Sequence, residues 1–175
     1  MILTGDAIHD AIVDGDITFS PFELDAINPN SINYRLGHRI LQVSANSDGD
    51  FAAGCEELML EENKFLLRKG CLYLGSTLET IGSDKYVTSL IGRSSVGRLG
   101  LFVQVSANLG HVGAIHQWTL ELVPSIDIYV YPGQTIGQVS FWQCAGDQQR
   151  YDGWFGQHNQ PMLSKHHDPF FLAGE

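Results

Sequence analysis

Two arginines and two serines lie within six consecutive positions of the segment GRSSVGR, in a chain of formal net charge −10. Forked guanidinium groups with hydroxyl and backbone N–H donors between them suit phosphate oxygens, and Gly92 and Gly97 allow close backbone approach. The alternative is a surface turn whose arginines pair with carboxylates, because the pattern is short and differs from a P-loop. The candidate anion-binding residues are Arg93, Ser94, Ser95 and Arg98.

A carboxylate, Glu121, lies in the apolar segment QWTLELV. Side chains alternate between the two faces of a strand, so Leu120 and Leu122 face one side. Glu121 shares the other side with Thr119 and Val123. An acid in such a strand is either a paired structural group or a general base, and a nearby arginine would fit both interpretations.

Strands are the elements that the hydrophobic pattern predicts around these groups. Apolar segments recur from residue 65 onward at intervals of about ten residues, which is typical of a sandwich or barrel. Hydrophobic residues make up 43% of the chain and charged residues 17%, with 19 glycines, as expected for a mainly β protein. The predicted strand segments are FLLRKG, CLYLGSTLETI, YVTSLIG, LFVQVSA, HQWTLELV, IDIYVYPG and IGQVSFWQ.

The first third of the chain is more mixed. Residues 4–14 predict a short amphipathic helix with Thr4 as its N-terminal cap. The segment SINYRLGHRILQV predicts two strands, and residues 44–63, rich in acids and turn formers, predict a solvated loop.

Composition excludes several classes of protein. A chain of 175 residues fits one domain, and no apolar run is long enough for a spanning helix or a signal peptide, so a cytoplasmic location is expected. The first 62 residues hold twelve acids against two arginines, a charge that repels nucleic acid.

The cysteines and histidines of the sequence do not indicate a disulfide framework or a metal site. The scattered Cys55, Cys71 and Cys144 predict reduced thiols in the core. His111 and His116 are five residues apart, which places them on opposite faces of a regular strand, so no protein-bound metal is expected.

Several motifs together resemble one family. The block IGRSSVGRLGLFVQVSA, followed by TLEL and YPGQTIGQVSF, is similar to the dCTP deaminase branch of the trimeric dUTPase-like superfamily. Earlier segments, LTGDAI, SPF, SINYRLG and STLETI, and the tail YDGWFGQHNQPMLSK also have counterparts in that family. The resemblance implies a distorted β-barrel or jelly-roll-like fold, with 1–175 as one domain and 145–175 as a C-terminal flap or tail. It also implies a homotrimer with active sites at the subunit interfaces.

The same resemblance implies roles for individual residues. Glu121 would be the general base that activates water for attack on C4 of cytosine, with Ser94 and Arg98 orienting that water and stabilising the intermediate. The phosphate-binding turn would serve partly a neighbouring subunit, and Mg²⁺ would accompany the triphosphate. The implied substrate-binding residues are Arg93, Ser95, Ala107, His111, Thr119, Leu120, Tyr151 and Gln157, the last on the closing flap.

Five features depart from the family pattern. His111 stands where the family's D-P-G turn has an Asp that holds the sugar hydroxyl and, in dUTPases, the attacking water; Val112 stands for the Pro of that turn. Asn33 and Pro124 replace an Asp and an Asn, and the tail lacks the family's phosphate-binding Lys. The His at position 111 disfavours a diphosphatase.

The sequence therefore predicts metal-independent deamination of a cytosine nucleotide, with dCTP converted to dUTP and ammonia as the first expectation. Three alternatives stay open. These are a deaminase for dCMP, CMP, CTP or a modified cytosine nucleotide, a non-catalytic nucleotide-binding or regulatory module, and a diphosphatase.

Overall fold

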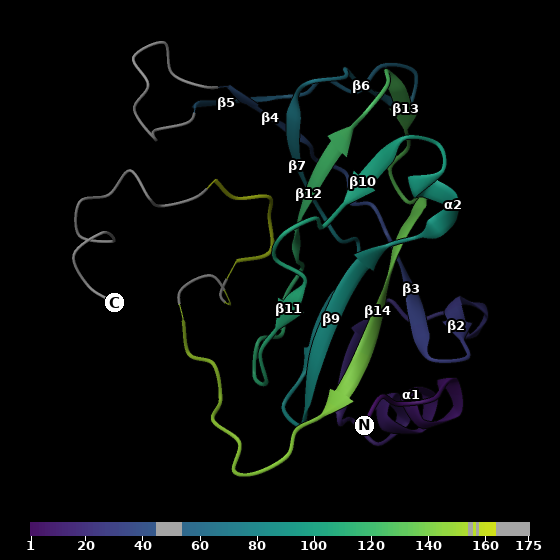
Figure 1. Cartoon of the computed structure of the whole chain (residues 1–175), viewed down its shortest axis with the longest axis vertical. Coiled ribbons are helices and arrows are strands. Elements are labelled where there is room, and N and C mark those ends of the chain that lie inside the picture. Colours follow the sequence, from purple (N-terminus) through teal and green to yellow (C-terminus); the bar gives the residue numbers. More distant parts are fainter. Residues whose placement is uncertain (45–53, 154–155, 157, 164–175) are drawn as a thin grey trace.

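Two antiparallel five-stranded sheets make up most of the structure, a computed structural model that describes residues 1–44, 54–153, 156 and 158–163 (Figure 1). The first sheet has the order β10 (Leu101–Val103), β12 (Thr119–Pro124), β7 (Leu72–Ser76), β4 (Leu41–Ser44), β5 (Gly54–Glu57). The second has the order β11 (Leu109–Gly110), β9 (Tyr86–Gly92), β14 (Thr135–Gln143), β3 (Ser31–Arg35), β2 (Ile27–Asn28).

Smaller elements complete the described fold. Two further pairs are β1 (Ile17–Ser20) with β8 (Thr80–Ser83), and β6 (Phe65–Leu67) with β13 (Ile128–Val130). The helical elements are α1 (Gly5–Val13), the 3-10 turn η1 (Leu24–Ala26) and α2 (Ser94–Gly97).

One hydrophobic core lies between the sheets. Strand β12 contributes the buried Leu120 and Leu122, and β14 of the other sheet contributes Val139 and Phe141, all fully buried. Along β12 buried and half-buried residues alternate, so Glu121 lies on the face opposite the core, as the sequence predicts. The core therefore fixes the direction in which Glu121 points.

The N-terminal helix forms as predicted. Thr4 is its N-cap, with its hydroxyl accepting a hydrogen bond from the Ala7 amide at 3.4 Å. Ile8 and Ala11 are buried, and helix α1 lies at the lower end of the molecule, where it contacts β1, β2 and β3 (Figure 1). The mainly β architecture with a short N-terminal helix is thereby confirmed.

Some local predictions are wrong. The segment predicted as a loop at 44–63 contains β5, which pairs with β4, because hydrogen bonding to a neighbouring edge outweighs a polar composition. The segment CLYLGSTLETI forms two strands, since β7 pairs within the first sheet and β8 leaves to pair with β1. Residues 45–53 lie outside the described part of the chain.

The cysteines are free thiols, but none is fully buried in the core, although Cys71 packs against it. Cys55 is exposed, and Cys71 and Cys144 are half-buried. Cys55 lies on the polar edge strand β5, where side chains reach solvent. No helix among the described residues is long and apolar enough to cross a membrane.

Candidate functional site

The predicted anion-binding turn forms the short helix α2, with Arg93 as the residue preceding its first turn. Ser94 and Ser95 are exposed at the start of this helix, and Arg98 is exposed at its end. Among the residues that the structure describes, neither Arg93 nor Arg98 forms a salt bridge. The alternative of a turn held by arginine–carboxylate pairs thus finds no support in the described chain.

The two glycines of the turn differ in what surrounds them. A Cβ atom at Gly92 would lie 3.2 Å from Cβ of Val103, so this glycine lets β9 pack closely beside β10. A Cβ atom at Gly97 would meet no atom within 4 Å. Gly92 is therefore required by strand packing, and Gly97 leaves the surface of the turn open.

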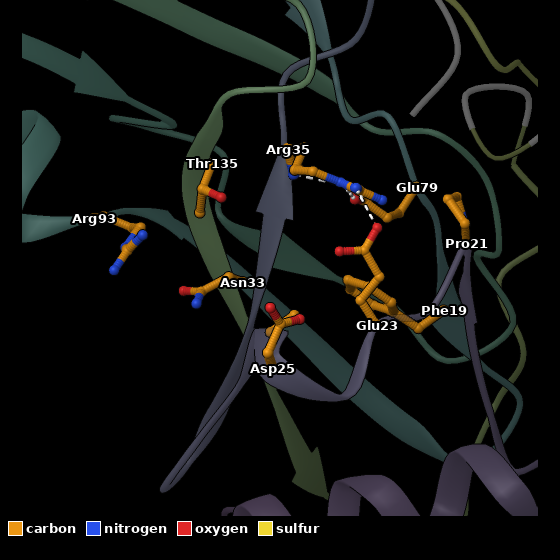
Figure 2. A pocket seen from close by; sticks show the side chains of 10 residues that line it. Phe19, Pro21, Glu23, Asp25, Asn33, Arg35, Glu79, Arg93 and Thr135 are labelled. Atoms are coloured by element: carbon orange, nitrogen blue, oxygen red, sulfur yellow. Dashed lines mark hydrogen bonds and ion pairs between the residues drawn. The ribbon is translucent and has the colours of Figure 1, made fainter.

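A cavity of about 260 Å³ lies beside Arg93 (Figure 2). The side chains of Arg93 and Asn33 are at one end of it, and Arg35, Glu79 and Glu23 form an ion cluster at the other. Asn33 comes from β3 and Arg93 from the end of β9, two strands that each pair with β14. The sheet thus brings the predicted turn next to the segment SINYR.

The ion cluster in this cavity has the geometry of a buried structural ion pair. Glu79 is 1% exposed and accepts hydrogen bonds from the Arg35 backbone N–H at 2.9 Å and from its Nε at 2.7 Å. Arg35 also donates from Nη1 to Glu23 at 2.6 Å. The hydrogen bond to Glu79 is the main cause that raises the pKa of Arg35 above its ordinary value. Arg35 therefore compensates the charge of a carboxylate that water does not reach.

Glu121 is held by a different partner. The Ser106 hydroxyl lies 3.0 and 2.9 Å from the two carboxylate oxygens, and the Ser106 backbone N–H donates to Oε2 at 3.3 Å. Glu121 is half-buried on β12 and forms no salt bridge with any described residue. The partner of this acid among the described residues is thus a serine and not Arg93 or Arg98.

Gln104 connects this carboxylate residue to the segment around Ala107. Its side-chain amide accepts from the Glu121 backbone N–H at 3.1 Å and donates to the Ala107 carbonyl at 2.8 Å. Gln104 is 7% exposed and has a positive φ of 57°, a backbone conformation that non-glycine residues rarely adopt. The sequence prediction missed both Gln104 and Ser106. A partial signal was available, because Gln104 directly follows the apolar segment LFV and Ser106 comes two residues later.

A second cavity, of about 270 Å³, lies next to Glu121, and we call it the tail cavity. It brings together four of the predicted substrate-binding residues, Ala107, His111, Thr119 and Tyr151. Leu120 is fully buried in the core, so only its main chain faces this region, and Gln157 lies outside the described residues. The other lining residues are Gln104, Leu109, Gly110, Ala114, His116, Trp118, Gly156, His158 and Met162.

Both histidines of the 111–116 segment line the tail cavity, contrary to the prediction of opposite strand faces. The segment between β11 and β12 is irregular, with only an isolated bridge from Ile81 to His116, so the alternation of a strand does not apply. His111 is exposed and stacks on Tyr151, with ring centroids 5.4 Å apart. No group of three or more His, Cys, Asp or Glu side chains suited to a metal ion occurs in the described chain.

The C-terminal segment contacts the wall of the tail cavity. Tyr151 donates its backbone N–H to Val112 at 2.8 Å, and Met162 donates to the Thr119 hydroxyl at 3.3 Å. The Thr119 hydroxyl in turn donates to the Gln160 carbonyl at 3.4 Å. Residues on both sides of the undescribed positions 154, 155 and 157 therefore lie against β12 and the 111–113 turn.

Within one chain the turn and Glu121 do not share a cavity. Ser125, just beyond β12, donates its backbone N–H to the Gly100 carbonyl at 2.7 Å, so α2 lies at the far end of that strand. Gln104, at the other end of β10, is opposite Glu121. Arg93 lines the first cavity, whereas Glu121 lines neither cavity and is two residues from Thr119, which lines the tail cavity.

Comparison with known proteins matches these motifs to one family. Residues 2–144 match the family model described as "dCTP deaminase-like". Two curated relatives, from Cytophaga hutchinsonii and Clostridium acetobutylicum, are 42% and 39% identical to the chain, and each alignment covers 93% of this chain and 96% of the relative. Both are named "dCTP deaminase, dUMP-forming".

A solved structure shares the fold. The 2'-deoxycytidine 5'-triphosphate deaminase from Agrobacterium tumefaciens superimposes with a TM-score of 0.65 at 23% identity, over 80% of this chain. The match covers 47% of that longer chain, so this chain spans about half of its length. The family match over residues 2–144 and the identity of about 40% to relatives along nearly the whole sequence agree with the turn, strand and carboxylate described above. The chain therefore belongs to the dCTP deaminase-like family.

Proposed function

We propose that this protein catalyses the hydrolytic deamination of dCTP, with Glu121 as the general base. The observation that carries the proposal is the Glu121 carboxylate, which is held by Ser106 next to the tail cavity, whose described lining itself contains no carboxylate. Thr119 lines that cavity, and Glu121 is the next residue on the same face of β12. A base in this position lies within reach of a ring bound in the tail cavity.

One carboxylate is sufficient for both proton transfers of the reaction. Glu121 takes a proton from water while the water oxygen bonds to C4 of the cytosine ring. Glu121 gives this proton to ring N3 as the C4=N3 double bond opens, and it then carries the remaining proton of the new hydroxyl to the amino group, which leaves as ammonia as the C4 carbonyl of uracil forms. Proton transfer by a positioned group contributes about 10²–10⁴-fold to rate in enzymes of this kind. Ser94 and Arg98 would orient the water and stabilise the tetrahedral intermediate.

The turn around α2 is proposed to hold the phosphates. Arg93 and Arg98 have no carboxylate partner among the described residues, and Ser94 and Ser95 are exposed between them. Mg²⁺ enters this proposal as part of the Mg·dCTP substrate. Main-chain groups of Ala107 and of 119–121 would contact the base edge, and Gln157 would close over the phosphates.

The active assembly is proposed to be a homotrimer with sites between subunits. Support comes from the separation within one chain, because α2 lies beyond the C-terminal end of β12, whereas Glu121 lies in the middle of that strand. A site that uses both groups then needs the turn of a neighbouring copy. Exposed apolar side chains near α2 and at the end of β10, namely Leu99, Phe102 and Val105, are 50–66% exposed in the single chain and would be covered by such a neighbour.

The product of the proposed reaction is either dUTP or dUMP. The relatives named "dUMP-forming" favour a second hydrolysis that releases pyrophosphate, so that dCTP ends as dUMP. His111 at the position of the family's water-holding Asp favours release of dUTP, the first expectation from the sequence. We propose deamination as the common step, and dUMP formation as a second activity that the relatives' names favour.

A single assay separates these outcomes. Purified protein is mixed with dCTP and MgCl₂, the loss of cytosine absorbance is followed, and the products are separated by chromatography with pyrophosphate measured in parallel. Conversion to dUTP without pyrophosphate supports deamination alone, and dUMP with equimolar pyrophosphate supports both activities. No turnover of dCTP, dCMP, CTP or CMP, together with thermal stabilisation by a nucleotide, would show a non-catalytic binding module instead.

Removing the hydroxyl that holds Glu121 should slow the reaction without abolishing it. Ser106→Ala removes one hydrogen bond to a charged carboxylate, which is worth about 1.5–3 kcal/mol. We expect kcat for dCTP to fall by roughly tenfold or more, with KM changed less, because the base loses its fixed orientation. Steady-state kinetics test this, and the exposed Ser125→Ala variant is the matched control.

An unchanged kcat in Ser106→Ala would show that Glu121 does not depend on this contact. Equal losses in Ser106→Ala and Ser125→Ala would point to a general effect on folding. Comparison of their melting temperatures separates the two explanations.

A further inference from the structure

The tail cavity offers few hydrogen-bond acceptors to a ligand. Its described lining contains no Asp or Glu. Gln104 already uses both ends of its amide, on Ala107 and Glu121. The Thr119 hydroxyl is engaged by the C-terminal segment, with Gln160 and Met162 as partners. Among side chains, a ligand with hydroxyl donors therefore finds its acceptor in the aromatic and imidazole groups.

His116 provides such an acceptor. The side chain lines the tail cavity, the residue is 8% exposed, and its Nδ1 lies 2.8 Å from the Gln117 carbonyl oxygen. A carbonyl oxygen only accepts, so Nδ1 carries the proton of the neutral ring and Nε2 carries the lone pair. None of the described residues forms a hydrogen bond with Nε2 of His116. The nine-tenths-buried ring thus keeps one acceptor available.

The surroundings of His116 keep it neutral and fixed. Burial is the main cause that lowers its pKa below the ordinary value, and the neighbouring His158 lowers it further. Its ring lies 4.3 Å from the Trp118 ring, and Trp118 is itself anchored through Nε1 to the Ile81 carbonyl at 2.9 Å. A neutral imidazole held between a backbone bond and an indole has little freedom to turn.

The proposed substrate has few hydrogen-bond donors that could bond to His116. A cytosine nucleoside has hydrogen-bond donors on the 4-amino group and on the sugar hydroxyls. The amino group leaves during deamination and so has to face Glu121 and the attacking water. The sugar hydroxyl is the remaining donor, and a buried site that lacks an acceptor for it would bind the nucleotide weakly.

We propose that Nε2 of His116 accepts a hydrogen bond from the sugar hydroxyl of the bound nucleotide, which makes His116 a specificity-determining residue of the tail cavity. This inference rests on the proposed function. In this arrangement His116 supplies the hydrogen-bond acceptor, since no carboxylate lines the cavity. His111, which is exposed and stacked on Tyr151, forms the outer wall.

The test compares dCTP with 2',3'-dideoxy-CTP, which lacks the sugar hydroxyl. Binding is measured by calorimetry in full-length protein carrying Glu121→Gln, so that turnover does not interfere, and kinetics are measured with Glu121 intact. With His116 present, dCTP should bind about tenfold more tightly than the dideoxy analogue. His116→Phe, which keeps a ring against Trp118, should bind both nucleotides equally, raising KM for dCTP about tenfold with little change in kcat.

Two further variants give controls. His116→Gln places an amide oxygen near the position of Nε2 and should restore part of the preference for dCTP. His111→Phe changes the other histidine of the same wall and should retain the full preference. Unchanged affinity of His116→Phe for the dideoxy analogue shows that the cavity is still folded.

The possible outcomes test the role of His116 and the proposed function separately. A tenfold preference that persists in His116→Phe, or that disappears in His111→Phe instead, overturns the role of His116 and leaves the proposed function intact. Failure of every variant to bind any cytosine nucleotide overturns the proposed function itself. Loss of the preference in His116→Phe with recovery in His116→Gln supports the inference.

Discussion

Glu121→Gln should lower kcat for dCTP deamination by about 10²–10⁴-fold while dCTP still binds. The amide keeps the size of the side chain and can still contact Ser106, but it cannot take a proton from water. Neither cavity described above has a second carboxylate positioned next to Thr119 and Ala107, so no neighbouring acid replaces Glu121. Steady-state kinetics and calorimetric titration with dCTP measure the two quantities separately.

The matched control for this substitution is Glu56→Gln. Glu56 is an exposed carboxylate on β5, at the edge of the same sheet, and lines neither cavity. Its replacement should leave kcat within twofold, an order-of-magnitude allowance for surface changes. If Glu121→Gln keeps more than about a tenth of wild-type kcat, Glu121 is not the general base, since loss of such a group costs at least about a hundredfold.

Arg35→Leu should cause the largest loss of stability. The substitution leaves Glu79, which is 1% exposed, without the guanidinium at 2.7 Å that compensates its charge. Removing one partner of a buried ion pair costs about 3–5 kcal/mol of the free energy of unfolding. For a domain of this size, that corresponds to a fall in melting temperature of roughly 10 °C. Thermal unfolding at fixed protein concentration measures it, because assembly would also shift the transition.

Arg39→Leu is the control for the Arg35 prediction. Arg39 forms an equally close pair with Glu57, at 2.8 Å, but both side chains are about half exposed and water screens them. We expect a much smaller change in melting temperature. The double variant Arg35→Leu/Glu79→Gln should recover part of the loss, because it removes the uncompensated charge. Equal effects of Arg35→Leu and Arg39→Leu would contradict the role of burial.

The sequence was most informative where chemistry and periodicity coincide in a short segment. The alternation in TLELV correctly placed Leu120 and Leu122 in the core and Glu121 on the opposite face, because the side-chain period of a strand is a local property. The cap and apolar stripe of residues 4–14 likewise predicted α1. Family motifs added the fold, which the solved relative confirms.

The sequence predictions were wrong where the local structure depends on a partner that is distant in the sequence. β5 forms because β4 offers it an edge, although its own residues are polar. His111 and His116 share a cavity because the chain between β11 and β12 is irregular and crosses beneath the C-terminal segment. The sequence prediction missed Ser106 and Gln104 because their role depends on hydrogen bonds to Glu121, a residue on a strand fifteen or more positions away.

The amino-acid sequence by itself determined which residues have the chemistry: a forked cationic turn, one carboxylate on a β-strand and a mainly β chain around them. Those properties are set by side-chain type and by the two-residue period of a strand, which need no knowledge of the rest of the molecule. The tertiary structure decided that Glu121 is held by Ser106 and not by an arginine, that the turn lies beyond the C-terminal end of β12, and that His116 lines the tail cavity. These are matters of sheet order and long-range contact, and such contacts are fixed only when the core between the two sheets forms.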